Sequence, residues 1–241
     1  MPKGSLEYWR DRLTRAGVPV ENAGTRFGEP VLRVADPDGL PLELVATDRA
    51  RPGDAWLRGG VPVDAAISGF HSATLLEATH EPTAALLTDV MGFRAIGHEG
   101  DRLRFEAPGD EGRALVDVLS ASHASYGNPG AGTVHHIAWR TPDDAQQSEW
   151  RKRLVAGGHH VSPVMDRTYF HSIYYREPGS ILFEIATDPP GFAIDEAPEH
   201  LGERLLLPPQ VEPHRARLER TLPPLVLPHQ KTTEETHAPT I

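Results

Sequence analysis

The sequence predicts an α+β fold made of repeated βαβββ units with curved mixed sheets. Two observations carry this prediction. The chain has 241 residues, of which 39% are hydrophobic, so it can bury a substantial core. It also repeats itself: a gapless shift of 141 residues lays residues 9–44 onto residues 150–185. A repeat of this length is typical of a fold assembled from copies of one supersecondary unit.

The two repeated segments have the same local pattern. Each begins with a helix carrying Trp and Leu on one face, followed by a glycine suited to a helix C-cap. Two short strands follow, joined by the turns DPDG at 36–39 and EPGS at 177–180. Nine residues of the first copy are identical in the second: Trp9, Arg10, Arg12, Leu13, Gly17, Val20, Arg26, Pro37 and Glu43.

The order strand, helix and three strands occurs completely twice, and this order defines the domain organisation. The second unit (69–119) and the third unit (133–188) are complete, whereas the first unit (1–48) lacks its opening strand. Residues 49–68 and the glycine-rich 120–132 are expected to be linkers. Residues 189–241 form a C-terminal extension with a helix around 211–222 and disorder at its polar end.

Composition excludes several functions. The formal net charge of −10 disfavours nucleic acid, whose phosphates attract basic surfaces. The lack of cysteine excludes disulfides, thiolate metal sites and thiol nucleophiles, which leaves histidine and carboxylate as the metal ligands. No apolar run is long enough for a membrane helix and the first residues do not resemble a signal peptide, so we expect a cytoplasmic protein that does not enter membranes.

His135 and His136 open the third unit in the segment TVHHIAW (133–139), which we expect to be a strand. Strand alternation would turn the two side chains to opposite faces, so they would have different roles. A single histidine on a strand is more often a structural residue than a ligand, and this interpretation stays open for both.

Glu184 lies in a strand that is otherwise apolar or small, between Phe183 and Ile185. A buried carboxylate without a partner costs several kcal/mol, so a positive group must face it. An arginine is one candidate and a metal ion is the other. With a histidine from the first strand of the same unit, Glu184 would supply two thirds of a 2-His-1-carboxylate site, which suits non-heme Fe(II).

The segment from Asp166 to Gly179 is dense in polar and aromatic side chains. Arg167 could hold an anionic oxygen, and Tyr174 could donate or accept a proton. Counting through the EPGS turn places Tyr174 and Glu184 on adjacent antiparallel strands. The alternative is an ordinary edge strand with tyrosines packed on the surface.

These motifs, HHIAW and DRTYFHSIYYREPGSILFEIATDPPGF above all, resemble the ring-cleaving dioxygenases of the vicinal oxygen chelate or glyoxalase-like superfamily, in the branch that opens hydroquinones. The resemblance implies that His136 and Glu184 bind Fe(II). It also implies that His135, Arg167 and Tyr174 handle protons and substrate oxygens. The expected substrates are a small aromatic hydroquinone and O2, and the expected product is a ring-opened acid.

The sequence departs from this family in length. Family members have four βαβββ units, and a further metal-binding histidine lies on the first strand of the first of them. We therefore expect an N-terminally truncated chain whose activity is open. His71, which aligns with His136, could replace the third ligand, or it could be structural. Glu43 is the repeat partner of Glu184. Because no strand with a histidine precedes it in this chain, we expect the first unit to have kept the carboxylate without a metal.

Two other classes stay open on the sequence alone. One is a lyase or isomerase of the same superfamily that uses another divalent metal, and the other is a protein of the same fold that binds a small molecule without turnover. The sheet edge left by missing strands leaves homo-oligomerisation open as well.

Overall fold

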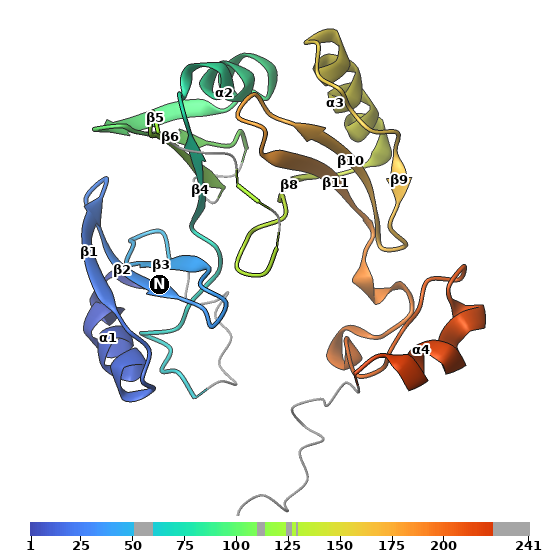
Figure 1. The fold of residues 1–241 in the computed structure, drawn as a ribbon, viewed down its shortest axis with the longest axis horizontal. Helices are drawn as coiled ribbons and strands as arrows, with labels where there is room; N and C mark the ends of the chain where they lie inside the picture. The colour runs from blue at the N-terminus through green and yellow to red at the C-terminus, as the bar shows by residue number, and fades with distance from the viewer. Residues whose placement is uncertain (51–59, 110–113, 124–126, 129, 224–241) are drawn as a thin grey trace, which may run out of the picture.

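The computed structural model describes residues 1–50, 60–109, 114–123, 127–128 and 130–223. In this part of the chain the strands form three sheets, which follow one another around an arc with helices α1, α2 and α3 on its outer side (Figure 1). Parallel and antiparallel pairs occur together in two of the sheets, which confirms the predicted α+β class with mixed sheets. Among the described residues, no helix combines the length and apolar character needed to cross a bilayer.

The first sheet has the order β1-β2-β3, with strands β1 (Glu21–Arg26), β2 (Glu29–Ala35) and β3 (Pro41–Val45). Helix α1 (Leu6–Arg15), preceded by the 3-10 turn η1 (Lys3–Ser5), precedes the sheet, so the unit follows the predicted order without an opening strand among its described residues. The turn between β2 and β3 closes on Asp36, whose Oδ1 accepts the backbone N–H groups of Asp38 and Leu40.

The second sheet has the order β4-β7-β6-β5. Its strands are β4 (Ser72–Glu77), β5 (Arg94–Glu99), β6 (Arg102–Glu106) and β7 (Leu115–Ser120). A helical segment lies between β4 and β5, where α2 (Glu81–Ala85) continues into the π-helical stretch η3 (Leu86–Val90). The chain returns from β7 to pair parallel with β4, and the other pairs are antiparallel.

The third sheet repeats this topology with the order β8-β11-β10-β9. Its strands are β8 (Ile137–Thr141), β9 (Met165–Asp166), β10 (Phe170–Arg176) and β11 (Leu182–Pro190), and helix α3 (Asp144–Ala156) follows β8. Asp143 caps α3 by accepting the N–H of Gln146. The opening strand starts at Ile137 rather than at residue 133, so His135 and His136 precede it, and the prediction of a strand over 133–136 is wrong.

The second and third units share one apolar core. Buried side chains from both units pack in a single cluster, among them Leu75, Phe105, Tyr175 and Phe183. A buried polar contact joins the same two units: the Thr83 hydroxyl lies 2.7 Å from Glu77 Oε2 and 2.5 Å from Glu177 Oε2. A hydroxyl has one proton to donate, so one of the two carboxyls must itself carry a proton, which the raised pKa of Glu77 favours.

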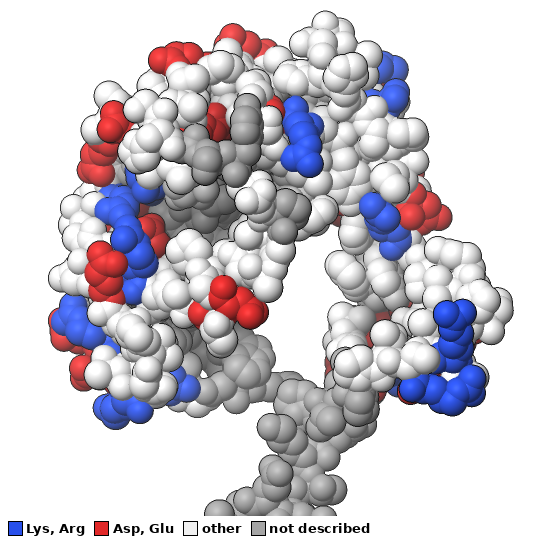
Figure 2. All heavy atoms as spheres, in the orientation of Figure 1, with Lys and Arg blue, Asp and Glu red and all other residues white. Residues whose placement is uncertain are grey.

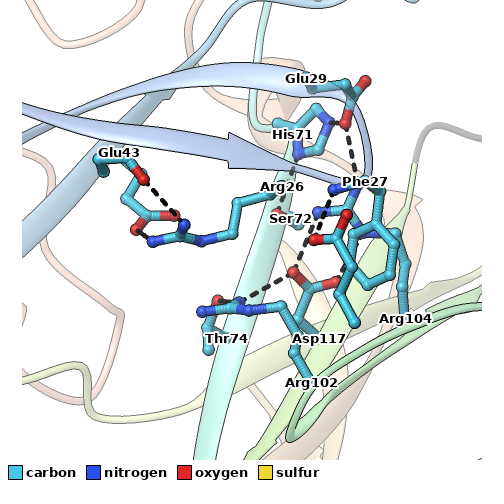
Figure 3. Close-up of polar contacts among 12 residues, drawn as sticks. Arg26, Phe27, Glu29, Glu43, His71, Ser72, Thr74, Arg102, Arg104 and Asp117 are labelled. Atoms are coloured by element: carbon cyan, nitrogen blue, oxygen red, sulfur yellow. Dashed lines mark hydrogen bonds and ion pairs between the residues drawn. The ribbon is translucent and has the colours of Figure 1, made fainter.

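The first unit contacts the second through a polar cluster, drawn in Figure 3. Glu29 accepts a bond from Arg104 (2.8 Å) and lies 3.0 Å from the His71 ring. Arg104 also lies over the Phe27 ring, 4.2 Å from its centroid. Phe27 fills the space beside Gly97, where a Cβ atom would lie 2.7 Å from the ring. Charged groups, rather than a shared apolar core, therefore dominate this junction.

The C-terminal extension leaves the third sheet through η4 (Phe192–Ile194), η5 (Pro198–His200), η6 (Glu212–His214) and α4 (Arg215–Thr221). The helix expected around 211–222 is therefore present as η6 and α4. The extension returns to the β9–β10 loop, where Phe192 stacks on Tyr169 at 5.1 Å. The disorder expected at the end of the chain concerns residues outside the described range.

On the face drawn in Figure 2, basic and acidic side chains are interspersed over the first unit, which lies at the left. The described residues on this face form no continuous basic stripe. Such interspersed charges are typical of an ordinary solvated surface.

Candidate functional site

The candidate site lies where the segment before β8 meets β11. His136 Nε2 is 2.7 Å from Glu184 Oε2. The Glu184 side chain is only 4% exposed, whereas that of His136 is 34% exposed. The histidine therefore lies between solvent and a buried carboxylate. Imidazole nitrogen and carboxylate oxygen are a donor pair suited to a divalent first-row metal.

Two hydroxyl groups occupy the other oxygen of Glu184. Tyr174 donates to Glu184 Oε1 at 2.9 Å, and the fully buried Ser172 donates to the same oxygen through a short hydrogen bond. Tyr174 and Glu184 are direct partners in the antiparallel β10–β11 ladder, so the adjacency expected from the EPGS turn is observed. The carboxylate thus has one oxygen held by hydroxyls and one directed at His136.

Arg167 approaches this group from the β9–β10 loop. Its guanidinium nitrogen Nη2 lies 3.4 Å from the Tyr174 hydroxyl, and its Cζ atom is 5.3 Å from the centroid of the Tyr174 ring. Arg167 is exposed and contacts Glu184 only through Tyr174. A guanidinium beside a tyrosine hydroxyl attracts anionic oxygens.

His135 and His136 contact each other, contrary to the alternation expected for a strand. Their Nδ1 atoms are 2.8 Å apart and their rings are nearly perpendicular. Because both residues precede β8, the backbone is not held in the pleat that would separate their side chains. His136 reaches Glu184 and His135 contacts the opposite side of the His136 ring, so the two histidines still occupy different places.

The three sheets carry an acidic residue at the same place in the ladder, on the last strand opposite the strand before it. Glu43 faces Arg33, Asp117 faces Arg104 and Glu184 faces Tyr174. Asp117 receives two bonds from Arg104 and one from Arg102. Glu43 pairs with Arg26 at 3.1 Å and Arg33 at 3.6 Å.

Glu184 differs from its two counterparts in having no arginine or lysine ion pair within the described part of the chain. His136 is its ion-pair partner, and a histidine carries a positive charge only when it is protonated. The arginine that we considered as a partner for Glu184 is therefore absent from its contacts, and a cation from solution remains a suitable partner.

His71 does not join His136 and Glu184. Its ring nitrogens contact Glu29 and Ser72 instead, at 3.0 Å each (Figure 3). Across the described ranges, no group of three or more His, Cys, Asp or Glu side chains is arranged to hold a metal. Of the two interpretations left open for His71, these contacts support the structural one, because Glu29 and Ser72 engage both of its ring nitrogens. Within the described part of the chain, His136 and Glu184 are the two candidate ligands at this site.

Ser172 is the residue that the sequence interpretation missed. It lies two positions before Tyr174, so period-two alternation puts both side chains on the face of Glu184, and this was the available signal. His171, on the opposite face, contacts Asp144 at the start of α3 (2.6 Å) and has a structural place.

One cavity lies apart from this site, between β8, α3 and the second unit. Its volume is about 640 Å³, and aromatic side chains of Phe93, Trp139 and Trp150 line part of it. Neither His136 nor Glu184 lines it, so its walls do not contribute to the carboxylate site.

Comparison with known proteins identifies the family. Residues 69–195, just over half of the chain, match the model of the glyoxalase/bleomycin resistance protein/dioxygenase superfamily. A protein of Bacillus subtilis (strain 168) named as the ring-cleaving dioxygenase MhqO is 47% identical over 222 residues, which are 92% of this chain and 70% of that protein. The chlorohydroquinone/hydroquinone 1,2-dioxygenase of Sphingobium indicum is 33% identical over 226 residues, with 92% and 70% of the two chains covered.

A solved structure extends the comparison to the fold. The crystal structure of a Bacillus subtilis protein described as a dioxygenase superposes with a TM-score of 0.86 and 46% identity, over 93% of this chain and 71% of that one. This chain thus spans about 70% of the length of these relatives. It belongs to the glyoxalase/bleomycin resistance protein/dioxygenase superfamily, among the ring-cleaving dioxygenases.

Proposed function

We propose that this chain is an Fe(II)-dependent dioxygenase that cleaves the ring of hydroquinone-type substrates with O2 in the cytoplasm. The name of the Sphingobium relative supports the substrate class, because that protein is named for chlorohydroquinone and hydroquinone. The observation that carries the proposal is the buried Glu184 carboxylate, which faces a histidine and two hydroxyls where its counterparts face arginines.

The residues present fit a divalent metal. His136 Nε2 and Glu184 Oε2 supply one nitrogen and one oxygen ligand from one edge of the sheet, and the remaining positions stay open to water or substrate oxygens. Bound Fe(II) would supply the electron transfer through which O2 and an aromatic ring react. Ring-cleaving enzymes of this superfamily generally depend on a metal, and the choice of iron is part of the proposal.

The protein groups around the ligands hold protons and orient the substrate. Tyr174 donates to Glu184 Oε1 and accepts from Arg167, so its oxygen can pass or receive a proton at a substrate hydroxyl. Arg167 favours a substrate oxygen that has lost its proton. His135 is exposed and contacts the His136 ring, and in this proposal it accepts the proton that a hydroquinone releases on binding.

Metal content and oxygen uptake test the proposal together. Fe(II) is added without oxygen, excess metal is removed, and uptake is followed with hydroquinone and chlorohydroquinone in an oxygen electrode. We expect bound iron and oxygen uptake that both disappear in Glu184→Ala. Glu43→Ala is the matched control, because it removes the acid at the same ladder position of the first sheet, and it should retain iron.

Two results would contradict the proposal and favour the alternatives. Zinc, nickel or manganese bound without oxygen uptake would indicate a lyase or isomerase. No bound metal, with a ligand-dependent rise in melting temperature, would indicate a small-molecule-binding protein.

A further inference from the structure

The two carboxylate oxygens of Glu184 have different partners. Oε1 accepts from Ser172 and Tyr174, and Oε2 faces His136 Nε2 at 2.7 Å. A carboxylate with both donors on one oxygen cannot rotate without losing them. The side chain is therefore fixed with Oε2 toward the position that a cation would share with His136.

Ser172 holds the more deeply buried half of this arrangement. Ser172 is 0% exposed. Its hydroxyl reaches Glu184 because Ser172 and Tyr174 lie on the same face of β10. Because Ser172 is surrounded by the core, water cannot replace its hydroxyl as a hydrogen-bond donor to Glu184. Ser172 therefore restricts the carboxylate more than the half-buried Tyr174 does.

The second sheet shows what the same two positions do when they carry charge. There Arg102 and Arg104, again two residues apart on the strand beside the acid, both bond to Asp117. Two guanidinium groups thus pair with that carboxylate, although Arg104 also pairs with Glu29. In the third sheet two neutral hydroxyls take these places, so Glu184 is held by two hydrogen bonds that do not cancel its negative charge.

We infer that Ser172 is a positioning residue of the metal site, which orients Glu184 through Oε1 and leaves Oε2 to bind the metal. The inference rests on the proposed function in one respect, namely that the site binds a divalent metal. Hydrogen bonds that orient metal ligands typically contribute about 10- to 100-fold to metal affinity, and Ser172 is expected to contribute within this range.

The test compares metal affinity and ligand geometry among hydroxyl variants. Co(II) serves as the probe, since its visible absorption reports the ligand arrangement, and Fe(II) affinity is measured without oxygen by competition with a chromogenic chelator. We expect Ser172→Ala to bind both metals about 10- to 100-fold more weakly, with an altered Co(II) spectrum. Ser172→Thr keeps a hydroxyl and should recover the wild-type spectrum and most of the affinity.

Thr141→Val is the matched control, because it removes a buried hydroxyl of the same sheet that bonds to Gln146 rather than to Glu184. It should lower stability without changing metal affinity. If wild type binds Co(II) and Ser172→Ala binds it equally with the same spectrum, the role of Ser172 is wrong while the metal site stands. If wild type binds neither metal, the proposed function and this inference both fail. Circular dichroism of each variant confirms that it is folded.

Discussion

At the scale of single residues, the side chain across the ladder from the acid decides what that acid can bind. An arginine at this place closes Asp117 and Glu43 into ion pairs, and a tyrosine leaves Glu184 with a hydrogen bond and with His136 as its ion-pair partner. The Arg104–Asp117 pair therefore indicates that a single substitution, an arginine at position 174, would weaken metal binding by Glu184.

Tyr174→Arg should reproduce the Arg104–Asp117 pair at Glu184. We expect metal affinity to fall at least about tenfold, because a guanidinium would occupy the carboxylate and repel the cation. The fold should persist, since the other two sheets accommodate arginine at this place. Tyr174→Phe is the control, with the ring kept and the charge unchanged. Equal metal binding by Tyr174→Arg and wild type, measured by competition titration, would show that Glu184 is not a ligand.

Glu29 should make stability depend on acidic pH. Burial alone would raise the pKa of Glu29, but hydrogen bonds from His71 and Thr47 and the Arg104 contact lower it to about 2. The native state thus binds this proton less readily than the unfolded state, whose pKa is 4.5. The stabilisation is complete above pH 4.5 and is lost as pH falls toward 2.

Urea unfolding of wild type and Glu29→Gln at pH 3 and pH 7 checks this dependence. The variant should be less stable than wild type at pH 7, with a smaller difference at pH 3. Glu21→Gln, which removes an exposed ion pair with Arg33, should differ little at either pH. A difference that does not change with pH would contradict the assignment.

At the scale of elements, the contacts between sheets depend on two close approaches. One is the Phe27 ring over Gly97, at the β1–β2 turn, and the other is the buried meeting of β4, α2 and the β10–β11 turn at Thr83. Neither involves the carboxylate site, so each can be tested without changing metal ligands.

Gly97→Ala should loosen the first unit from the second. The new Cβ would lie 2.7 Å from the Phe27 ring, which must move away, and overpacking of this kind costs about 1–3 kcal/mol. Gly4→Ala is the control, since no atom lies within 4 Å of its added Cβ. Hydrogen exchange of residues 21–45 should accelerate in Gly97→Ala only. Unchanged exchange there would mean that Phe27 does not support the contact.

Glu77 should make the junction of the second and third units sensitive to neutral pH. Burial and the nearby Glu177 charge raise its pKa to about 7, although the Thr83 hydrogen bond opposes this. The native state therefore binds the proton more tightly than the unfolded state. The stabilisation is complete below pH 4.5 and is lost as pH rises toward 7, by about 3 kcal/mol in all.

Glu77→Gln, which keeps the shape and removes the charge, tests this dependence. The unfolding free energy of the variant should fall less between pH 5 and pH 8 than that of wild type, and Glu199→Gln, at an exposed position, should behave like wild type. Parallel pH profiles of Glu77→Gln and wild type would overturn the prediction.

At the scale of the whole molecule, two kinds of junction predict two steps of unfolding. The second and third units share an apolar cluster, whereas the first unit contacts the second through ion pairs around Glu29 and Arg104. We expect residues 21–45 to exchange amide protons at lower denaturant than residues 72–188, as a separate cooperative group. Exchange of all three sheets at one denaturant concentration would contradict this expectation.

Sequence reasoning predicted the repeated architecture because the repeat and the turn residues are local signals. The DPDG and EPGS turns placed β2–β3 and β10–β11 correctly, and with them the Tyr174–Glu184 pair. The expected alternation of His135 and His136 was wrong, because both residues precede β8. Sequence reasoning left two roles open for His71, because its partner Glu29 lies 42 residues away. Which unit docks on which depends on such distant contacts, and periodicity carries no information about them.

The stacking of Phe192 on Tyr169 has a consequence for the arginine beside the site. Tyr169 also donates to Asp195, and its carbonyl accepts the N–H of Gly191, so the segment after β11 braces the loop that carries Arg167. Thr168 lies between Arg167 and Tyr169 and has a positive φ of 71°, which residues other than glycine rarely adopt. The segment that follows β11 therefore supports the β9–β10 loop. The orientation of Arg167 toward Tyr174 depends on residues outside the sheet that holds Glu184.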